Sequence, residues 1–272
     1  MRSDRLIPGL SARLAQFQEV LRRGTKELGN VVLPTECAGC GAWDEVVCAT
    51  CFTQMLGEPK EFTIETPGVE IRGFGVARYE AEMRRLVVTQ KHDRHRDLGV
   101  FFEAAGYHLA AEVVNRGYLG SRPSHSEVFV VKAPSTNPRR SSRVSEAFAA
   151  GITAGLTQSG WARRAAILDL LEMKPGTTTQ AGLSRTQRAS NRHHRMRVVG
   201  SEMVARRELR GAAVVLVDDV RASGATLQEM VRALQAVGAE ISAGFVFAAT
   251  AFSSNLKPGG ESAAEVLRQT RG

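Results

Sequence analysis

Two adjacent acids, Asp218 and Asp219, follow the aliphatic run at residues 214–217 and precede the small-residue loop RASGAT. In an open parallel sheet, ligands bind in a crevice beyond the carboxyl ends of the strands, so a strand at this run directs both carboxylates toward that crevice. Gly224 permits a positive φ angle, and the backbone amides of residues 222–226 converge at the start of the helix that we expect next. Two acids beside such a phosphate cradle suit a ligand with a phosphate and, nearby, vicinal hydroxyls or a divalent cation. A ribose 5-phosphate has this chemistry.

The hydroxyls of Ser223 and Thr226 could serve in two ways, as hydrogen-bond donors to a bound phosphate or as caps of the following helix. The loop is neither a GxGxxG motif nor a Walker loop, because no GK[ST] follows. The alternative interpretation is an ordinary strand–turn–helix unit whose acidic residues face water.

The four cysteines of the chain form two pairs, CAGC and CATC, at Cys37, Cys40, Cys48 and Cys51. Four thiolates at this spacing can close tetrahedrally on one Zn²⁺. Because every ligand would come from the protein, we expect a structural zinc that stabilises a module too small to fold on its own core. Disulfides, a redox-active CxxC pair and an iron–sulfur cluster are the alternatives.

A basic stripe recurs at intervals of three and four residues, which puts its members on one face of a helix. The stripe consists of Arg185, Arg188, Arg192 and Arg195. It could form a lid that closes on pyrophosphate, a track for the backbone of a nucleic acid, or a solvated basic face. No aromatic residue lies between residues 180 and 200, so base stacking is not the main source of any single-strand affinity from this segment.

Strand-like and helix-like apolar patterns alternate along most of the chain, after an amphipathic helix within residues 6–33. We expect strands at residues 71–79, 126–134, 165–172, 214–220 and 241–250, and helices from residue 81 and at residues 101–114, 144–156 and 226–238. Strands separated by helices form a parallel sheet covered on both faces. The predicted fold class is therefore α/β.

The Gly/Pro/Glu-rich residues 57–68 are typical of a linker. We therefore divide the chain into an N-terminal helix with a zinc-binding module (1–57), an α/β domain (69–250) and a tail (251–272). The net charge of +8 favours polyanionic partners, nucleic acid among them. Because the chain lacks a signal-peptide pattern and any run of about 18 apolar residues, we expect a cytoplasmic protein without a membrane span.

The stretch VVLVDDVRASGAT resembles the phosphoribosyl pyrophosphate signature of the type I phosphoribosyltransferases. The resemblance implies that Asp218 and Asp219 hold the ribose hydroxyls, directly or through Mg²⁺, and that the following loop surrounds the 5-phosphate. The loop residues are Val220, Arg221, Ala222, Ser223, Gly224, Ala225 and Thr226. Ala222 departs from the pattern, because family members that salvage purines carry an aspartate there that serves the base.

The cysteine pairs ahead of this signature narrow the resemblance to the ComF family, competence-associated proteins that resemble amidophosphoribosyltransferases, over residues 30–250. The matching segments are, in chain order, VVLPTECAGCG, LVVTQK, VFVVKAPS and QAGLSRTQRASN. The resemblance draws attention to Lys91, which we place at the start of a basic loop over residues 91–96. It also implies pyrophosphate binding by the loop that contains Lys132, Ala133, Pro134 and Ser135.

The resemblance implies a transferase that uses phosphoribosyl pyrophosphate and Mg²⁺, in which positioning and charge neutralisation, without a protein nucleophile, allow pyrophosphate to leave. It also implies a link to DNA uptake, with single-stranded DNA and the competence machinery as partners. The sequence contains no recognisable base-binding hood and no glutaminase domain. The alternative is therefore a non-catalytic competence factor that binds phosphoribosyl pyrophosphate and single-stranded DNA.

Overall fold

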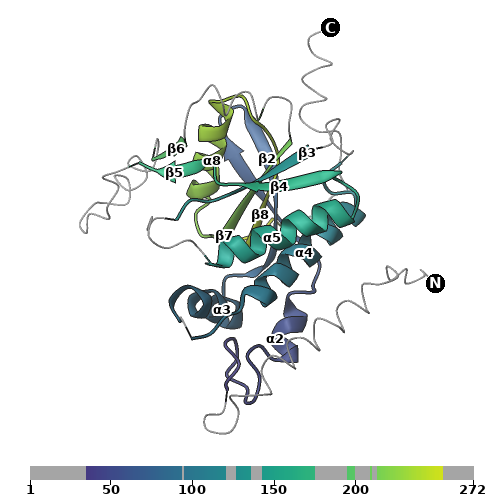
Figure 1. Cartoon of the computed structure of the whole chain (residues 1–272), viewed down its shortest axis with the longest axis vertical. Helices are drawn as coiled ribbons and strands as arrows, with labels where there is room; N and C mark the ends of the chain where they lie inside the picture. The colour runs from purple at the N-terminus through teal and green to yellow at the C-terminus, as the bar shows by residue number, and fades with distance from the viewer. Residues whose placement is uncertain are drawn as a thin grey trace, which may run out of the picture.

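The computed structural model describes residues 35–93, 95–120, 127–135, 143–174, 195–199, 209 and 213–253. These residues form a central sheet with helices on both of its faces (Figure 1). The sheet contains β1 (Lys60–Thr66), β2 (Val69–Arg78), β3 (Glu127–Lys132), β4 (Arg164–Leu168), β7 (Ala213–Arg221) and β8 (Glu240–Ala249). The helices are α2 (Ala49–Gln54), α3 (Ala81–His92), α4 (Gly99–Asn115), α5 (Arg143–Gln158) and α8 (Ala225–Gln235). A separate ribbon consists of β5 (Leu171–Met173) and β6 (Met196–Val198).

The strand order of the central sheet is β1-β2-β8-β7-β3-β4, and its neighbouring strands are parallel except for the β1–β2 pair. This arrangement confirms the predicted α/β fold with a parallel sheet flanked by helices. The strand that ends in the acid pair, β7, lies inside the sheet between β8 and β3. Because parallel strands end at the same edge, the carboxyl ends of β3, β7 and β8 converge beside the two acids.

The interpretation of residues 57–68 as a linker is wrong, because β1 occupies most of this segment and pairs with β2 as an antiparallel edge strand. Its side chains alternate: Phe62 and Ile64 are 1% and 2% exposed, whereas Glu65 is exposed. This period of two is the signature of a half-buried strand. The same alternation is present in the sequence KEFTIET, in which one threonine separates Phe62 from Ile64 and polar residues flank them. Because most of these residues are polar, the segment resembles a connecting loop.

The side chains of β7 belong to the two hydrophobic cores on opposite faces of the sheet. Val215 and Val217 pack with residues of α3, α4 and α5, whereas Val214 and Leu216 pack with residues of α8 and β1. A parallel strand that is buried on both faces must be apolar at successive positions, which explains the unbroken aliphatic run. The acids begin where the pairing of β7 with β3 ends, after Val217, while the pairing with β8 continues through Arg221.

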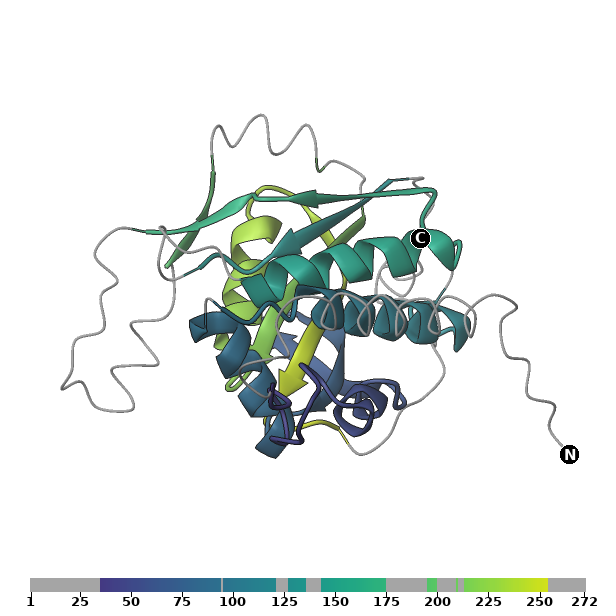
Figure 2. The ribbon, with the colours of Figure 1, turned by 60° about the horizontal axis from the view of Figure 1, so that its bottom comes forward.

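Helices α4 and α5 lie side by side on one face of the sheet (Figure 2). Their backbones approach closely because three glycines stand at the crossing. A Cβ atom at Gly151 would lie 1.9 Å from the carbonyl oxygen of Glu103, and one at Gly106 would lie 2.3 Å from that of Phe148. A Cβ atom at Gly155 would come within 2.7 Å of Ala110. The close crossing therefore depends on residues without side chains.

The ribbon of β5 and β6 is attached to α8, on the other face of the sheet. Glu229 of α8 accepts a hydrogen bond from the Met196 amide at 3.1 Å, and Arg232 donates to the Met196 carbonyl at 2.9 Å. The two side chains also form an ion pair at 2.7 Å, and Glu229 is 5% exposed. Both backbone groups of Met196 are thus bonded to α8.

The single strand predicted at residues 165–172 is wrong, because the segment divides between β4 in the central sheet and β5 in the ribbon. The chain leaves the central sheet after Leu168, and the Val199 amide donates to the Leu170 carbonyl at 2.8 Å where the ribbon begins. The two halves have different pairing partners, and no local pattern specifies a partner.

Several predicted segments lie outside the described residues, among them the helix within residues 6–33 and the tail beyond residue 253. The division into modules at residues 1–57 and 69–250 stays a prediction. Among the helices that the structure describes, none combines the length and the apolar character needed to cross a bilayer.

We predict that Gly151→Ala destabilises the protein by about 2–3 kcal/mol, because the new methyl group would force α4 and α5 apart. Thermal or urea unfolding of the full chain measures the effect. The matched control is Gly57→Ala, where the nearest atom to the added Cβ is the Gln54 carbonyl oxygen at 3.7 Å, an ordinary contact. Equal stability of the two variants would contradict the close crossing.

Candidate functional site

The two acids at the end of β7 are buried. Asp218 is 7% exposed and Asp219 is 8% exposed, so they lie deeper than the open crevice that the sequence suggested. The Asp219 amide donates a hydrogen bond to the Asp218 carboxylate at 2.8 Å. Carboxylates so close together and so far from water cannot both ionise freely.

Burial raises the pKa of Asp218 from its ordinary value of 3.8 to about 8, and the negative charge of Asp219 adds to the increase. The hydrogen bond from the Asp219 amide and the positive charge of Lys91 offset only part of it. At neutral pH, Asp218 is therefore largely protonated. A protonated carboxyl can donate as well as accept a hydrogen bond, which suits a sugar hydroxyl.

Lys91 contacts the acid pair directly, with its Nζ 2.6 Å from Oδ2 of Asp219. The predicted loop over residues 91–96 begins two positions too early, because α3 continues through His92 and Lys91 lies in its last turn. A cation there is favoured by the helix dipole, and it neutralises the buried carboxylate. The contact joins residues that the sequence separates by more than a hundred positions.

The loop after β7 has the backbone geometry expected of a phosphate cradle. Gly224 has a φ angle of +80°, which confirms the predicted left-handed conformation, and it is the N-cap residue of α8. Gly224 itself has no side chain that could cap this helix start, and the roles of the Ser223 and Thr226 hydroxyls stay predictions. Thr250 holds the loop by donating a hydrogen bond from its hydroxyl to the Ala222 carbonyl at 2.7 Å. Amide groups at an uncapped helix start are good donors to an anion.

The residues of the predicted loop differ in their exposure to solvent. Ala222 and Ser223 are exposed, and the half-buried positions are Val220, Arg221, Gly224, Ala225 and Thr226.

Arg221 has a buried Nε atom that bonds to no protein group. Its guanidinium carbon lies 4.8 Å above the ring of Phe62, and its Nη1 donates to the Ala251 carbonyl at 3.2 Å. Burial lowers the pKa of Arg221, and the charge of Glu65 only partly offsets this. A buried donor without an acceptor is costly, so an anion beside this atom would satisfy a group that the chain itself leaves unbonded.

A pocket of about 90 Å³ opens beside Arg221 and the start of α8. Its lining consists of Thr63, Ile64, Glu65, Arg221, Ser223, Gly224 and Gln228. Gln228 closes one side by donating to the Glu65 carbonyl at 2.9 Å. The contribution of β1 to this pocket was missed in the sequence, because the segment was interpreted as a linker.

Lys132 ends β3, next to Val217 of β7 in the sheet register. Its side chain is 15% exposed, and its Nζ lies 3.1 Å from Glu146 and 3.2 Å from Asp169. Burial lowers the pKa of Lys132, but the two acidic partners outweigh it and raise the pKa. The sequence analysis anticipated neither acid, because the two come from α5 and from the end of β4.

The rest of the predicted pyrophosphate loop continues from β3. The Ala133 amide donates to the Val217 carbonyl at 2.8 Å, and Ala133 is buried, whereas Pro134 and Ser135 are half-buried. Of the basic stripe, Arg185, Arg188 and Arg192 lie outside the described residues. Arg195 directly precedes β6, and its carbonyl accepts a hydrogen bond from the Lys174 amide at 2.7 Å. The roles of these residues stay predictions.

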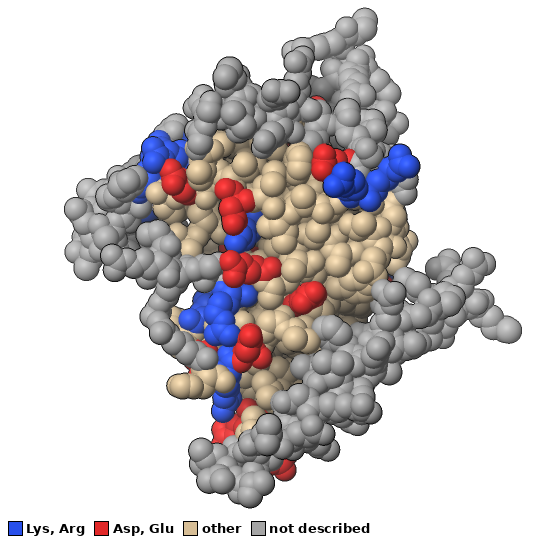
Figure 3. All heavy atoms as spheres, in the orientation of Figure 1, with Lys and Arg blue, Asp and Glu red and all other residues tan. Residues whose placement is uncertain are grey.

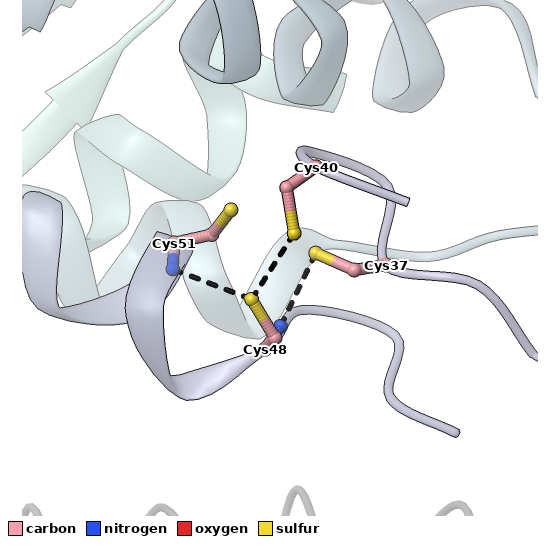
Figure 4. A group of neighbouring side chains, drawn as sticks. All are labelled: Cys37, Cys40, Cys48 and Cys51. Carbon is pink, nitrogen blue, oxygen red and sulfur yellow. Dashed lines mark hydrogen bonds between the residues drawn. The ribbon is translucent and has the colours of Figure 1, made fainter. Parts of the chain in front are cut away.

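The four cysteines form a second candidate centre, in which their thiols point toward one another (Figure 4). The four sulfur atoms all lie within 4.8 Å of one another, and none of them is in a disulfide. The Cys48 amide donates to the sulfur of Cys37 at 3.3 Å, and the Cys51 amide donates to that of Cys48 at 3.5 Å. Four convergent thiols with amide donors are the arrangement that holds a tetrahedral metal ion.

The thiols differ in their pKa values because they share one small volume. Burial raises the pKa of Cys37, but the amides of Cys48, Cys40 and Gly39 outweigh it and bring the pKa to about 7. Burial raises the pKa of Cys48, and burial together with the negative charge of Cys37 raises that of Cys51. Four thiolates can coexist here only with a cation among them, so the cluster fits a divalent metal.

We predict that a metal chelator lowers the melting temperature of the full chain. A metal bound at a thousandfold excess over its Kd contributes about 4 kcal/mol, or roughly 10 °C for a chain of this size. Differential scanning fluorimetry measures the shift, and metal analysis measures the loss of the ion. A reductant without chelator is the control and leaves the melting temperature unchanged, whereas a disulfide would give the opposite pattern.

We predict that Asp218→Asn stabilises the protein at neutral and alkaline pH. An acid whose pKa is higher in the folded state favours folding while it is protonated, and this contribution is lost as the pH rises from about 4 through about 8. The gain of the variant over the parent should therefore grow across that window to roughly 1–3 kcal/mol. Urea unfolding at a series of pH values measures it.

Glu240→Gln is the matched control, because it neutralises an exposed acid at the start of β8 and brings no such gain. A difference between Asp218→Asn and the parent that is constant with pH would contradict the raised pKa.

Comparison with known proteins adds one match. The family model described as the phosphoribosyl transferase domain matches residues 169–259, which include β7, the loop with Gly224, α8 and β8. No curated protein sequence matches the chain. Residues 169–259 are thus similar to a phosphoribosyl transferase domain, within a mixed α/β fold that has a cluster of four cysteines near its N-terminal side.

Proposed function

We propose that this protein binds phosphoribosyl pyrophosphate together with Mg²⁺ and acts as a phosphoribosyltransferase of the ComF type. The observation that carries the proposal is the sequence of groups at the end of β7. A buried acid pair comes first, then an arginine with an unbonded buried Nε, and then a helix that begins at Gly224, which has no side chain to cap it. The matched phosphoribosyl transferase domain supports the same ligand class.

In this proposal, the two ends of the ligand occupy different parts of the sheet edge. The amides of residues 222–226 and the Arg221 guanidinium bind the 5-phosphate, because amides at a helix start and an unbonded Nε atom are donors suited to an anion. Asp218 and Asp219 bind the ribose hydroxyls. Lys91 and the loop that begins at Lys132 face the pyrophosphate, because they bring positive charge to the same edge.

The reaction breaks the bond between C1 of the ribose and pyrophosphate and forms a bond from C1 to an acceptor. Positive charge develops on the sugar while negative charge leaves with the pyrophosphate. Mg²⁺, when bound, supplies charge neutralisation at the pyrophosphate and the sugar oxygens. The residues of the chain position the sugar through Asp219 and stabilise the leaving group through Lys91, which exchanges its partner Asp219 for a phosphate oxygen.

The cysteine cluster holds a structural zinc in this proposal. All four ligands come from the chain, and three of them, Cys37, Cys48 and Cys51, are buried. A closed set of four thiolates leaves no position for water or substrate. The metal therefore acts on folding and on the placement of neighbouring elements.

A second candidate is a non-catalytic competence factor that keeps the sugar-phosphate site and handles single-stranded DNA. The exposed Ala222 favours it, because this loop position supplies no carboxylate that could accept a proton from a base. Basic side chains lie next to acidic ones on the face shown in Figure 3. Among the described ion pairs, Arg143 pairs with Asp97 at 3.1 Å. Affinity for DNA would therefore come from other residues, and the arginines of the basic stripe are the candidates.

We predict that the full chain binds phosphoribosyl pyrophosphate with Mg²⁺ and that Asp219→Asn weakens binding by about tenfold or more, the equivalent of one charge-assisted hydrogen bond. Isothermal titration calorimetry measures the affinity. Glu240→Gln, an exposed acid at the start of β8, is the matched control and leaves the affinity unchanged. Equal affinities of all three proteins would contradict the ligand assignment. Pyrophosphate release across a panel of acceptors then separates the transferase from the non-catalytic factor.

A further inference from the structure

We propose that the metal-binding cysteine module controls the sugar-phosphate site through α3, because it holds the helix that positions Lys91 against Asp219. The inference rests on the proposed function for the identity of the ligand and of the metal. The link itself is a chain of contacts between described residues, and each of them can be tested.

The first contact joins the cysteine loop to the middle of α3. Arg85 donates a hydrogen bond from Nη1 to the Gly39 carbonyl at 3.0 Å, within the turn between Cys37 and Cys40. A Cβ atom at Gly39 would lie 2.8 Å from the sulfur of Cys51 and 3.4 Å from Leu86 of α3. The turn therefore fits between the metal ligands and the helix only because it carries a glycine.

Two further contacts fix the module to the rest of the fold. Arg96, in the connection from α3 to α4, donates from Nη1 to the Glu36 carbonyl at 3.0 Å. Phe52 of α2 packs edge-on against Phe101 of α4, with ring centroids 6.2 Å apart, and belongs to the same core as Leu86. The module thus contacts the connection from α3 to α4 and the first turn of α4.

The C-terminal end of α3 connects the position of the helix to the acid pair. Gln90 is 1% exposed, and its side chain accepts from the Leu98 amide at 2.7 Å and donates to Asp97 at 3.1 Å. The next residue is Lys91, whose Nζ lies 2.6 Å from Asp219. A shift of α3 would therefore change the counter-charge of Asp219, and with it the charge that a phosphate ligand meets.

Loss of the metal disturbs this chain of contacts at its first step. The cysteine turns are held in place by the shared ion, so without it the Gly39 carbonyl no longer has a fixed position opposite Arg85. The competing view is that α3 is held well enough by its own buried residues Met83, Leu86 and Val87. The two views differ in whether removal of the metal changes the position of Lys91 relative to Asp219.

The chemical reactivity of Lys91 tests the link without reference to any ligand. The full chain, loaded with zinc or stripped by a zinc-selective chelator, is treated briefly with an acetylating ester, and modification is quantified by mass spectrometry. We expect Lys91 to react several-fold faster in the stripped protein. Lys132 is the internal reference, because its partners Glu146 and Asp169 do not touch the module.

Because removal of the metal could loosen the whole chain, the decisive comparison is made with zinc bound. Arg85→Met removes the contact to Gly39 and leaves all four cysteines in place. We expect unchanged zinc content, faster acetylation of Lys91, and about fivefold weaker binding of phosphoribosyl pyrophosphate, within the range of one lost hydrogen bond. The matched control is Arg84→Met, an exposed neighbour on the same helix with the same change of charge, which should behave as the parent.

Lys91 reactivity that is the same in the parent, Arg84→Met and Arg85→Met would overturn the inference. A zinc-loaded parent that fails to bind phosphoribosyl pyrophosphate would overturn the proposed function instead, while the reactivity of Lys91 would still decide the link between the module and α3.

Discussion

The structure depends on how one sheet edge accommodates two buried carboxylates. Asp218 and Asp219 lie at the end of β7 with less than a tenth of their surface exposed, and isolated charges there would be strongly destabilising. Two features offset the cost of burying these charges. Asp218 carries a proton because its pKa is raised to about 8, and the ammonium group of Lys91 lies beside Asp219. The contact between Lys91 and Asp219 requires the last turn of α3 to lie near the end of β7, so the packing of this helix is part of the site.

The same edge is balanced in charge before any ligand arrives. Lys91 is paired with Asp219, and Lys132 is paired with Glu146 and Asp169. A phosphate ligand bound as we propose would therefore exchange one set of ion pairs for another, and its affinity would reflect the difference between the two sets. Arg221 is the exception, because its buried Nε has no protein partner and loses nothing when an anion binds. This contrast makes the loop after β7 the natural first point of attachment.

The cysteine module is integrated into the fold, so a metal bound there as we propose would act beyond local stability. Phe52 and Met55 share a core with residues of α3 and α4, and Arg85 and Arg96 bond to its backbone carbonyls. Small metal-stabilised units can act as independent domains joined by linkers, but here the connecting segment is itself the edge strand β1. The cysteine module, the edge strand β1 and the helix that carries Lys91 are therefore parts of one packing arrangement.

Local patterns in the sequence alone determined the parallel α/β sheet, the strand β7 with its terminal acids, the left-handed Gly224 and the four-cysteine cluster. Each of these follows from the spacing of neighbouring residues, because strand periodicity, turn stereochemistry and ligand spacing act over short stretches of chain. Only the tertiary structure decided that residues 60–66 are a strand, that residues 165–172 divide between two sheets, and that Lys91 neutralises Asp219. These features depend on which distant segments meet, and the free energy of such contacts comes from burial and charge pairing that no single segment contains.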